Sequence, residues 1–289
     1  MGKYIGKRIL LLVPAVFLVC VIVFALMRLV PGDAVDSIIY KYSSMGISAD
    51  RAEVEAMLGL DQPAVAQFFT WLKGVLTGDL GDSLFEYESV ASIIGRQLPV
   101  TLELGILTLL FSCILSIPIG LFCAAKQDSL PDYAFRVVAI LLVSIPVFWI
   151  ATMVIIYPSL WWGYAPPTTY VSFFENPLEN LRMFIIPALL GALMQAGIQM
   201  RTVRTMTLEV MRLDYIRTAW AKGTKERVIL FKHAFRNAMI PVVTMIGGSA
   251  ATMIGGSVIM ESVFNIPGIG QQVITALGSR DYPLVQGCV

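Results

Sequence analysis

The chain has 289 residues, of which 57% are hydrophobic and 14% charged, and its formal net charge is +1. Soluble domains carry about a quarter charged residues, and a mean hydropathy of +0.75 implies more apolar surface than one water-soluble core can bury. The composition therefore excludes an ordinary soluble domain and indicates an all-α polytopic membrane protein.

Five runs are apolar and long enough to cross a bilayer, which takes about 20 residues for about 30 Å of hydrocarbon. They are residues 9–30, 98–125, 135–161, 184–200 and 239–260. The first is too long for the apolar core of a signal peptide and lacks a cleavage site, so we expect it to be retained. The fourth is short and can extend into the polar stretch after it. A sixth run begins at "YPLVQGCV" and stops at Val289, too early to cross. Either the chain ends outside after five spans or, as we favour, the sixth span is cut short.

Lysine and arginine predict the orientation of the chain, because these residues are retained on the cytoplasmic side. Residues 32–97 contain few lysines and arginines and many acidic residues, whereas the N-terminus and the segment after the fourth run are rich in lysine and arginine. We therefore expect a cytoplasmic N-terminus, an external loop at 32–97 and a cytoplasmic segment after the fourth run. The positive residues on the cytoplasmic side would be Lys3, Lys7, Arg8, Arg201, Arg204, Arg212, Arg217, Lys222, Lys225, Arg227, Lys232 and Arg236.

The external loop is predicted to fold into two helices. Ser48 is a suitable N-cap for "ADRAEVEAML", and Gly59 suits the end of that helix. Pro63 fits the first turn of a second helix that stops at Gly78. Its apolar side would consist of Phe68, Phe69, Trp71 and Leu72, facing the membrane surface or an external partner. This predicts a division of the chain into residues 1–97, the first span with its folded loop, and residues 98–289, the transmembrane core.

Prolines recur inside the apolar runs, at Pro14, Pro118, Pro146 and Pro187. Each removes a backbone donor and can kink its helix, and neighbouring helices or cavity water can compensate for the loss. Kinked helices suit a moving pathway, and they also occur in static bundles. Both interpretations stay open at this point.

Residues able to hold a metal or perform catalysis do not cluster in the sequence. Cys20, Cys113, Cys123 and Cys288 lie in apolar runs without the paired spacing of a disulfide framework or zinc site, which favours packing. His233 is the single histidine, with no ligand cluster around it. We therefore expect no metal, no cofactor and no catalysis in this chain.

The segment "DYIRTAWAKGTKERVILFKHAFRNA" at 214–238 is the densest positive stretch and separates two apolar runs. Asp214 can cap a short helix that reaches Lys222, and Gly223 breaks it. Thr224 can then cap a second helix from Lys225 onward. The segment is thus predicted to be a helix, a tight turn and a helix on the cytoplasmic face.

The first of these helices carries an aromatic centre and a positive rim. Tyr215, Ala219 and Lys222 share one side at helical spacing, with Ile216 and Trp220 beside them. One interpretation is a basic surface helix held by anionic lipid headgroups. The other is a docking surface for a protein partner.

The segment "DYIRTAWAKG…HAFRNAMIPVV" resembles the cytoplasmic loop of binding-protein-dependent ABC importer permeases, in the branch that serves dipeptides, oligopeptides and nickel. Arg217, Thr218 and Ala219 occupy the E-A-A positions of that family's EAA-x-x-x-G pattern, and Gly223 matches its glycine. Trp220 stands where the peptide branch commonly has arginine. Further stretches similar to this branch, in order along nearly the whole chain, are "LVPGD", "LGLDQP", "GDLGDS", "LPVTLELG", "ESVFNIPGIG" and "RDYPLVQG".

The resemblance implies a type I ABC importer transmembrane fold with six spans and a cytoplasmic C-terminus. It also implies that the 214–238 segment contains a coupling helix that docks into a separate ATPase subunit. The docking residues would be Tyr215, Ile216, Ala219, Trp220 and Gly223, with Arg217 and Lys222 at the rim. The chain has no G-x-x-x-x-G-K-[ST] loop to hold phosphates, so ATP and its magnesium would be bound by the partner subunits.

The fifth run, with "MIGGSAATMIGGS", places Gly247, Ala251 and Gly255 on one helix face. Such a small-xxx-small face permits tight helix packing, and it could instead form a smooth wall of a translocation path. Charged residues occur near span ends at Arg28, Glu103 and Glu261. The arginine can reach the headgroups, whereas the two glutamates are candidates for a gate, since Glu261 leads into a turn or re-entrant piece at 267–270.

Together these features predict a permease subunit of an ATP-driven importer of di- and oligopeptides in the bacterial or archaeal cytoplasmic membrane. Its expected partners are a second homologous permease, two ATPase subunits, an external solute-binding protein and the lipid bilayer, and no nucleic acid. The alternatives are an importer of nickel or another small solute, a secondary transporter or channel, and a non-transporting membrane scaffold or receptor.

Overall fold

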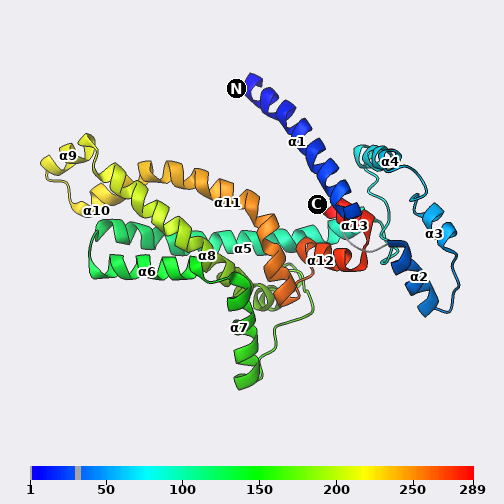
Figure 1. The fold of residues 1–289 in the computed structure, drawn as a ribbon. Helices are drawn as coiled ribbons and strands as arrows, with labels where there is room; N and C mark the ends of the chain where they lie inside the picture. Colours follow the sequence, from blue (N-terminus) through cyan, green and yellow to red (C-terminus); the bar gives the residue numbers. More distant parts are fainter. Residues whose placement is uncertain (1, 30–33) are drawn as a thin grey trace. The chain divides into compact units, whose positions relative to one another are not determined.

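The computed structural model describes residues 2–29 and 34–289, and its regular elements are helices (Figure 1). Val30, the predicted end of the first span, and most of the "LVPGD" motif lie outside the described residues. The chain divides into two compact units. Unit 1 consists of Met1–Leu98 and Gln272–Val289, and unit 2 consists of Pro99–Gln271. The prediction of an all-helical fold is confirmed.

Unit 1 begins with the apolar helix α1 (Gly2–Leu29), which contains most of the first predicted span. Three short helices follow, α2 (Ala34–Ser44), α3 (Arg51–Met57) and α4 (Ala64–Thr77). The unit also contains the first turns of α5 (Val90–Ala125), most of α12 (Ile269–Ser279) and α13 (Tyr282–Cys288).

The two helices predicted in the external loop are present as α3 and α4, with one cap in error. Helix α3 starts after Asp50, so Ser48 is not its N-cap; Asp50 has the extended backbone that an N-cap position requires. Gly59 follows the helix and has a φ of 65°, which agrees with its predicted place at the end of the helix. Pro63 immediately precedes α4, and Gly78 ends that helix with a φ of 83°.

Two apolar clusters form the core of unit 1. One joins α2 to α3 through the side chains of Val35, Ile38 and Val54. The other joins the start of α5 to α12 and α13, and its buried members are Met27, Val90, Ile93, Ala276, Leu284 and Val285. Gly287 allows the close approach of α13 to α5, since a Cβ there would lie 2.4 Å from a methyl carbon of Val90. Buried hydrogen bonds from Ser83 to Asp281 at 2.5 Å and from Gln97 to Gln272 at 2.8 Å connect segments far apart in sequence.

Unit 2 contains most of α5, then α6 (Leu130–Ser144), α7 (Val147–Trp162) and the long α8 (Pro177–Met211). It continues with α9 (Asp214–Ala221), α10 (Glu226–Val228), a π-helical segment η1 (Ile229–Ala234) and α11 (Phe235–Phe264). Helix α8 extends beyond the predicted fourth span into the polar stretch, as expected for so short an apolar run. Helix α8 packs against both α6 and α11.

The run at 135–161 is broken into two helices, which corrects its prediction as one continuous span. Helix α6 ends at Ser144, and α7 departs from it at 91° (Figure 1). Ile145, with a ψ of 129°, has the extended backbone imposed on a residue that precedes proline. Pro146 then starts α7. The predicted kink is thus a right-angled break.

Buried polar contacts fix α6 and α5 against α8. Both carboxylate oxygens of Asp132 accept bonds from the guanidinium of Arg204 at 2.8 Å, and Asp132 is fully buried. The hydroxyl of Ser116 donates to Gln199 at 3.0 Å. Close approach is permitted by Gly120, where a Cβ would meet Val203 at 2.7 Å. These contacts set the register of the three helices.

Three described helices are individually long and apolar enough to cross a membrane, namely those at Ile5–Leu29, Val90–Ala125 and Pro177–Met211. Two further candidates are bent pairs: α6 with α7, and the helix of Glu226–Thr252 with Ser257–Phe264, which bends by 51°. The predicted count of five is reached when each bent pair forms one span.

Candidate functional site

The predicted helix, turn and helix at 214–238 is present in unit 2. Helix α9 is followed by Gly223 at a φ of 74°, a backbone conformation that favours glycine. The second helix begins as α10 and continues through η1 into α11. Both predicted caps are displaced by one residue: Leu213 and Lys225 occupy the N-cap positions, and Asp214 lies in the first turn of α9.

Ile216 faces inward from α9, which corrects its assignment to a docking surface. Its side chain is fully buried against Ile229 and Ala234 of η1, with Ala219 partly buried beside it. A residue in this position holds α9 against the start of α11 and is not available to another protein. The spacing of Ile216, Tyr215 and Trp220 in the sequence does not show which side of this short helix is buried.

The outward residues of α9 are Tyr215, Arg217, Trp220 and Lys222, all of them exposed. Tyr215 is 42% and Trp220 is 45% accessible to solvent. Arg217 donates to Asp214 at 3.1 Å in an exposed pair. Two aromatic residues and two cations are thus exposed on α9, and Gly223 lies exposed after its end.

A set of three hydrogen bonds, which we call the tyrosine bridge (Tyr215, His233 and Asn237), connects α9 to η1 and α11. The amide of Asn237 donates to the hydroxyl of Tyr215 at 2.8 Å and to the carbonyl of His233 at 3.2 Å. The same tyrosine hydroxyl donates to the His233 carbonyl at 3.4 Å. π-Helical turns are rare and frequently occur at functional sites. Neither η1 nor the role of Asn237 had a signal in the sequence.

The small-residue face of α11 is uncovered. Gly247, Ala251 and Gly255 are exposed, and a Cβ on either glycine would meet nothing within 4 Å. Among the described residues the face therefore does not pack tightly against another helix. Its use as a wall of the translocation path stays a prediction.

Glu261 is enclosed by a tight turn at the end of α11. One carboxylate oxygen accepts the Gln271 N–H at 3.1 Å, and the residue is fully buried. A Cβ on Gly268 would lie 2.5 Å from this carboxyl group, and the Thr101 hydroxyl beside it accepts the Ile269 N–H at 2.8 Å. The predicted turn at 267–270 is present. In this conformation Glu261 holds the turn to α11 and does not line an open mouth.

Glu103 lies on α5 and is half-buried. Tyr170, in the loop before α8, donates its hydroxyl to this carboxylate at 3.4 Å. Burial raises the pKa of Tyr170, and the negative charge of Glu103 adds to the rise. The pair connects a span to an adjacent loop, and the assignment of Glu103 to a gate stays a prediction.

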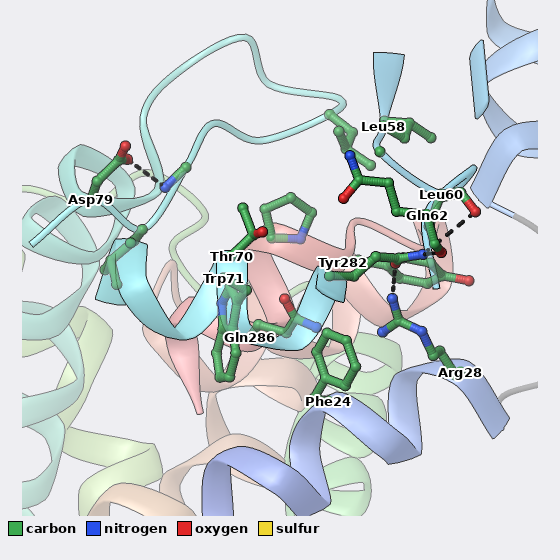
Figure 2. Close-up of a pocket in the computed structure, with 17 residues that line it drawn as sticks. Phe24, Arg28, Leu58, Leu60, Gln62, Thr70, Trp71, Asp79, Tyr282 and Gln286 are labelled. Carbon is green, nitrogen blue, oxygen red and sulfur yellow. Dashed lines mark hydrogen bonds between the residues drawn. The ribbon is translucent and has the colours of Figure 1, made fainter. Parts of the chain in front are cut away.

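Unit 1 contains a cavity of about 440 Å³ between the end of α1, the α3–α4 loop, α4 and α13 (Figure 2). Figure 2 shows Arg28 and Asp79 at opposite ends, with Thr70, Trp71 and Gln286 between them. The guanidinium of Arg28 donates to Gln67 and lies 3.7 Å from the ring centroid of Phe24. Arg28 thus makes contacts within unit 1, and its reach to the headgroups stays a prediction.

Metal-binding residues do not cluster in the described part of the chain: no group of three or more His, Cys, Asp or Glu side chains could hold an ion there. The four cysteines are free thiols in this structure.

Comparison with known proteins decides the family. Residues 116–289 match the family described as binding-protein-dependent transport system inner membrane component, and residues 1–105 match its N-terminal family. The chain belongs to this transport family. It is a multi-pass, inner-membrane permease component of an ABC system and is not itself catalytic. This assignment decides against the secondary transporter and the scaffold, and it implies ATPase and binding-protein partners.

Individual relatives match over nearly their whole length. A permease of Brucella suis biovar 1, named for a peptide transport system, is 39% identical over 288 residues, covering 99% of this chain and 90% of the relative. The dipeptide transport system permease protein of Escherichia coli K12 is 34% identical over 313 residues, covering 100% and 91%. The protein of the same description from Alkalihalophilus pseudofirmus is 33% identical over 306 residues, covering 99% and 91%.

Proposed function

We propose that this permease component carries short peptides across the cytoplasmic membrane, driven by ATP that partner subunits hydrolyse. The support is the identity to two dipeptide permeases over nearly the whole chain. The N-terminus lies in the cytoplasm, as the lysine and arginine distribution indicates. A second homologous permease completes the membrane-spanning pair, two ATPase subunits bind on the cytoplasmic side, and an external binding protein delivers the peptide.

The ATPase docks on the outward surface of α9. An exposed aromatic pair surrounded by cations has the composition of a protein-binding surface, in which aromatic side chains supply much of the binding energy. Tyr215 and Trp220 form the centre, Arg217 and Lys222 the rim, and Gly223 the end of this surface. Ile216 and Ala219 support it from below.

Motion of the ATPase reaches the membrane through the contact between α9 and η1. Because η1 continues directly into α11, a displacement of α9 is passed to a helix of the transmembrane bundle. The buried Ile216 and the tyrosine bridge couple the two helices mechanically.

The substitution Trp220→Asp tests the docking surface. It places a negative charge at the centre of the surface, and we expect the ATPase subunits to be lost on gentle co-purification and peptide uptake to fall by at least tenfold. Trp162→Asp is the control, because Trp162 is also exposed but lies at the end of α7. Retention of the ATPase by Trp220→Asp at the wild-type level would contradict the proposal.

A further inference from the structure

We propose that the cavity of unit 1 is a peptide-binding site within the permease itself, in which Asp79 holds the terminal ammonium of a short peptide and Arg28 holds its terminal carboxylate. The proposal rests on the proposed function for the class of cargo. It concerns a site separate from the docking surface on α9.

Opposite charges at the two ends of the cavity carry the proposal (Figure 2). One oxygen of Asp79 accepts the Gly81 N–H at 2.9 Å, which leaves its other oxygen available for a cation. Arg28 has five N–H donors, of which the described contacts use the one that donates to Gln67. A guanidinium prefers a carboxylate as partner because two parallel hydrogen bonds form. A free peptide presents both terminal charges at once.

Uncharged amide and indole groups line the space between the two charges. The Trp71 indole N–H is buried and has no hydrogen-bond partner among the described residues. The Gln62 and Gln286 side chains line the same cavity, and each amide offers both donors and an acceptor. Every non-proline residue of a peptide has a backbone N–H donor and a C=O acceptor. The cavity's amide and indole groups can therefore bind the backbone of the peptide without selecting for its side chains.

The size of the cavity limits the ligand to a few residues. Its volume of about 440 Å³ lies within the range of about 300–1,000 Å³ that holds small molecules. An extended chain advances about 3.3–3.6 Å per residue, so each added residue moves the carboxylate away from the ammonium. A cavity of this volume suits short peptides, such as the tripeptide used in the test below.

The test uses the assembled transporter without its binding protein and measures the binding of trialanine by calorimetry. We expect saturable binding that weakens roughly tenfold or more when either peptide end is blocked, by N-acetylation or by C-amidation. Asp79→Asn should remove the preference for a free amino end and keep the preference for a free carboxyl end. This substitution retains the acceptor for Gly81, so the turn is preserved. Asp61→Asn, on an exposed loop residue outside the cavity, is the control and should keep both preferences.

Three outcomes would overturn the site: equal binding of free and blocked peptides, equal behaviour of Asp79→Asn and Asp61→Asn, or complete displacement of trialanine by an anionic phospholipid, which would identify a lipid site. ATP-driven uptake with the binding protein present tests the proposed function separately. A transporter that takes up peptides but shows no binding dependent on the peptide ends contradicts this site alone.

Discussion

At the scale of single residues, the structure of unit 2 depends on a buried charge that is fully compensated. Asp132 is inaccessible to solvent, and Arg204, whose side chain is 14% accessible, provides two hydrogen bonds in the fork geometry that carboxylates favour. Arg136 lies 3.6 Å from the same carboxylate. The backbone N–H of Asp128 donates to it as well, at 3.0 Å. Removal of Arg204 leaves the buried carboxylate of Asp132 with Arg136, at 3.6 Å, as its remaining basic partner.

Arg204→Ala is therefore expected to lower the free energy of unfolding by up to about 3–5 kcal/mol, the cost of breaking a buried ion pair by removing one partner. Arg136 offsets part of this loss. Thermal unfolding of the purified chain in detergent measures the change. The control is Arg182→Ala, because Arg182 forms an exposed pair with Glu179 at 3.2 Å. Exposed pairs contribute up to about 1 kcal/mol. Similar shifts for the two variants would show that Asp132 is not dependent on Arg204.

At the scale of helices, the connection between α9 and α11 combines apolar packing with a polar lock. Ile216 packs against η1, and the hydrogen bonds of the tyrosine bridge fix the rotation of α9 about its own axis. A rigid connection passes displacement, whereas a loose one would absorb it. The bridge is therefore expected to matter more for the coupling of ATP hydrolysis to transport than for folding.

A double-mutant cycle on Tyr215→Phe and Asn237→Ala tests this expectation. Each variant should reduce the number of peptides transported per ATP hydrolysed by about two- to tenfold, as expected for a net loss of about 0.5–1.5 kcal/mol. The double variant should lose less than the sum of the two single effects, because both variants remove the bond between Asn237 and Tyr215, while each also removes its own bond to His233. Thr244→Val is the control, since its hydroxyl bonds only within α11, to Ile240 at 3.1 Å. Additive losses would contradict a shared bridge.

Elements of unit 2 also show where sequence-based prediction succeeds and where it cannot. Long apolar runs, Gly223 and the turn after Glu261 were predicted because each depends on a local requirement for lipid or for a backbone conformation. Pro146 was recognised, but a proline in an apolar run does not reveal how far the helix bends. Ile216 was placed on the wrong face, since a short helix between two others can bury either side.

Contacts between distant segments had no signal in a single sequence. The pairs Asp132–Arg204 and Arg28–Gln67, and the bridge to Asn237, depend on which helices become neighbours. The cavity of unit 1 has the same origin, because its lining comes from both ends of the chain.

At the scale of the whole molecule, the small-residue face of α11 is the surface on which the proposed second permease can be tested. Gly247, Ala251 and Gly255 form an exposed strip on which a second permease could approach closely. Small residues in the interior behave differently: at Gly197 a Cβ would lie 3.0 Å from the carbonyl oxygen of Ala139. Gly197 thus permits close packing within the chain, whereas a Cβ at Gly247 or Gly255 would meet nothing within 4 Å.

Ala251→Leu should leave the unfolding temperature of the isolated chain unchanged within about 1–2 °C, since surface substitutions change stability by less than about 0.5 kcal/mol. It should abolish co-purification with the second permease, or peptide uptake if the strip lines the path. Gly197→Leu, the contrasting variant, should destabilise the chain itself because overpacking displaces α6. A marked loss of stability in Ala251→Leu would show that the strip is covered within one chain.

The bond between Asp132 and Arg204 also has a consequence for biogenesis. The two residues are 72 positions apart, so at about 5–20 residues per second the ribosome needs roughly 4 to 14 s to synthesise the arginine after the aspartate. During that interval Arg136 is the basic side chain of α6 that can pair with Asp132. The hydrogen bonds that join α6 to α8 therefore form only after both helices have been synthesised, so this packing is a late step in the assembly of unit 2.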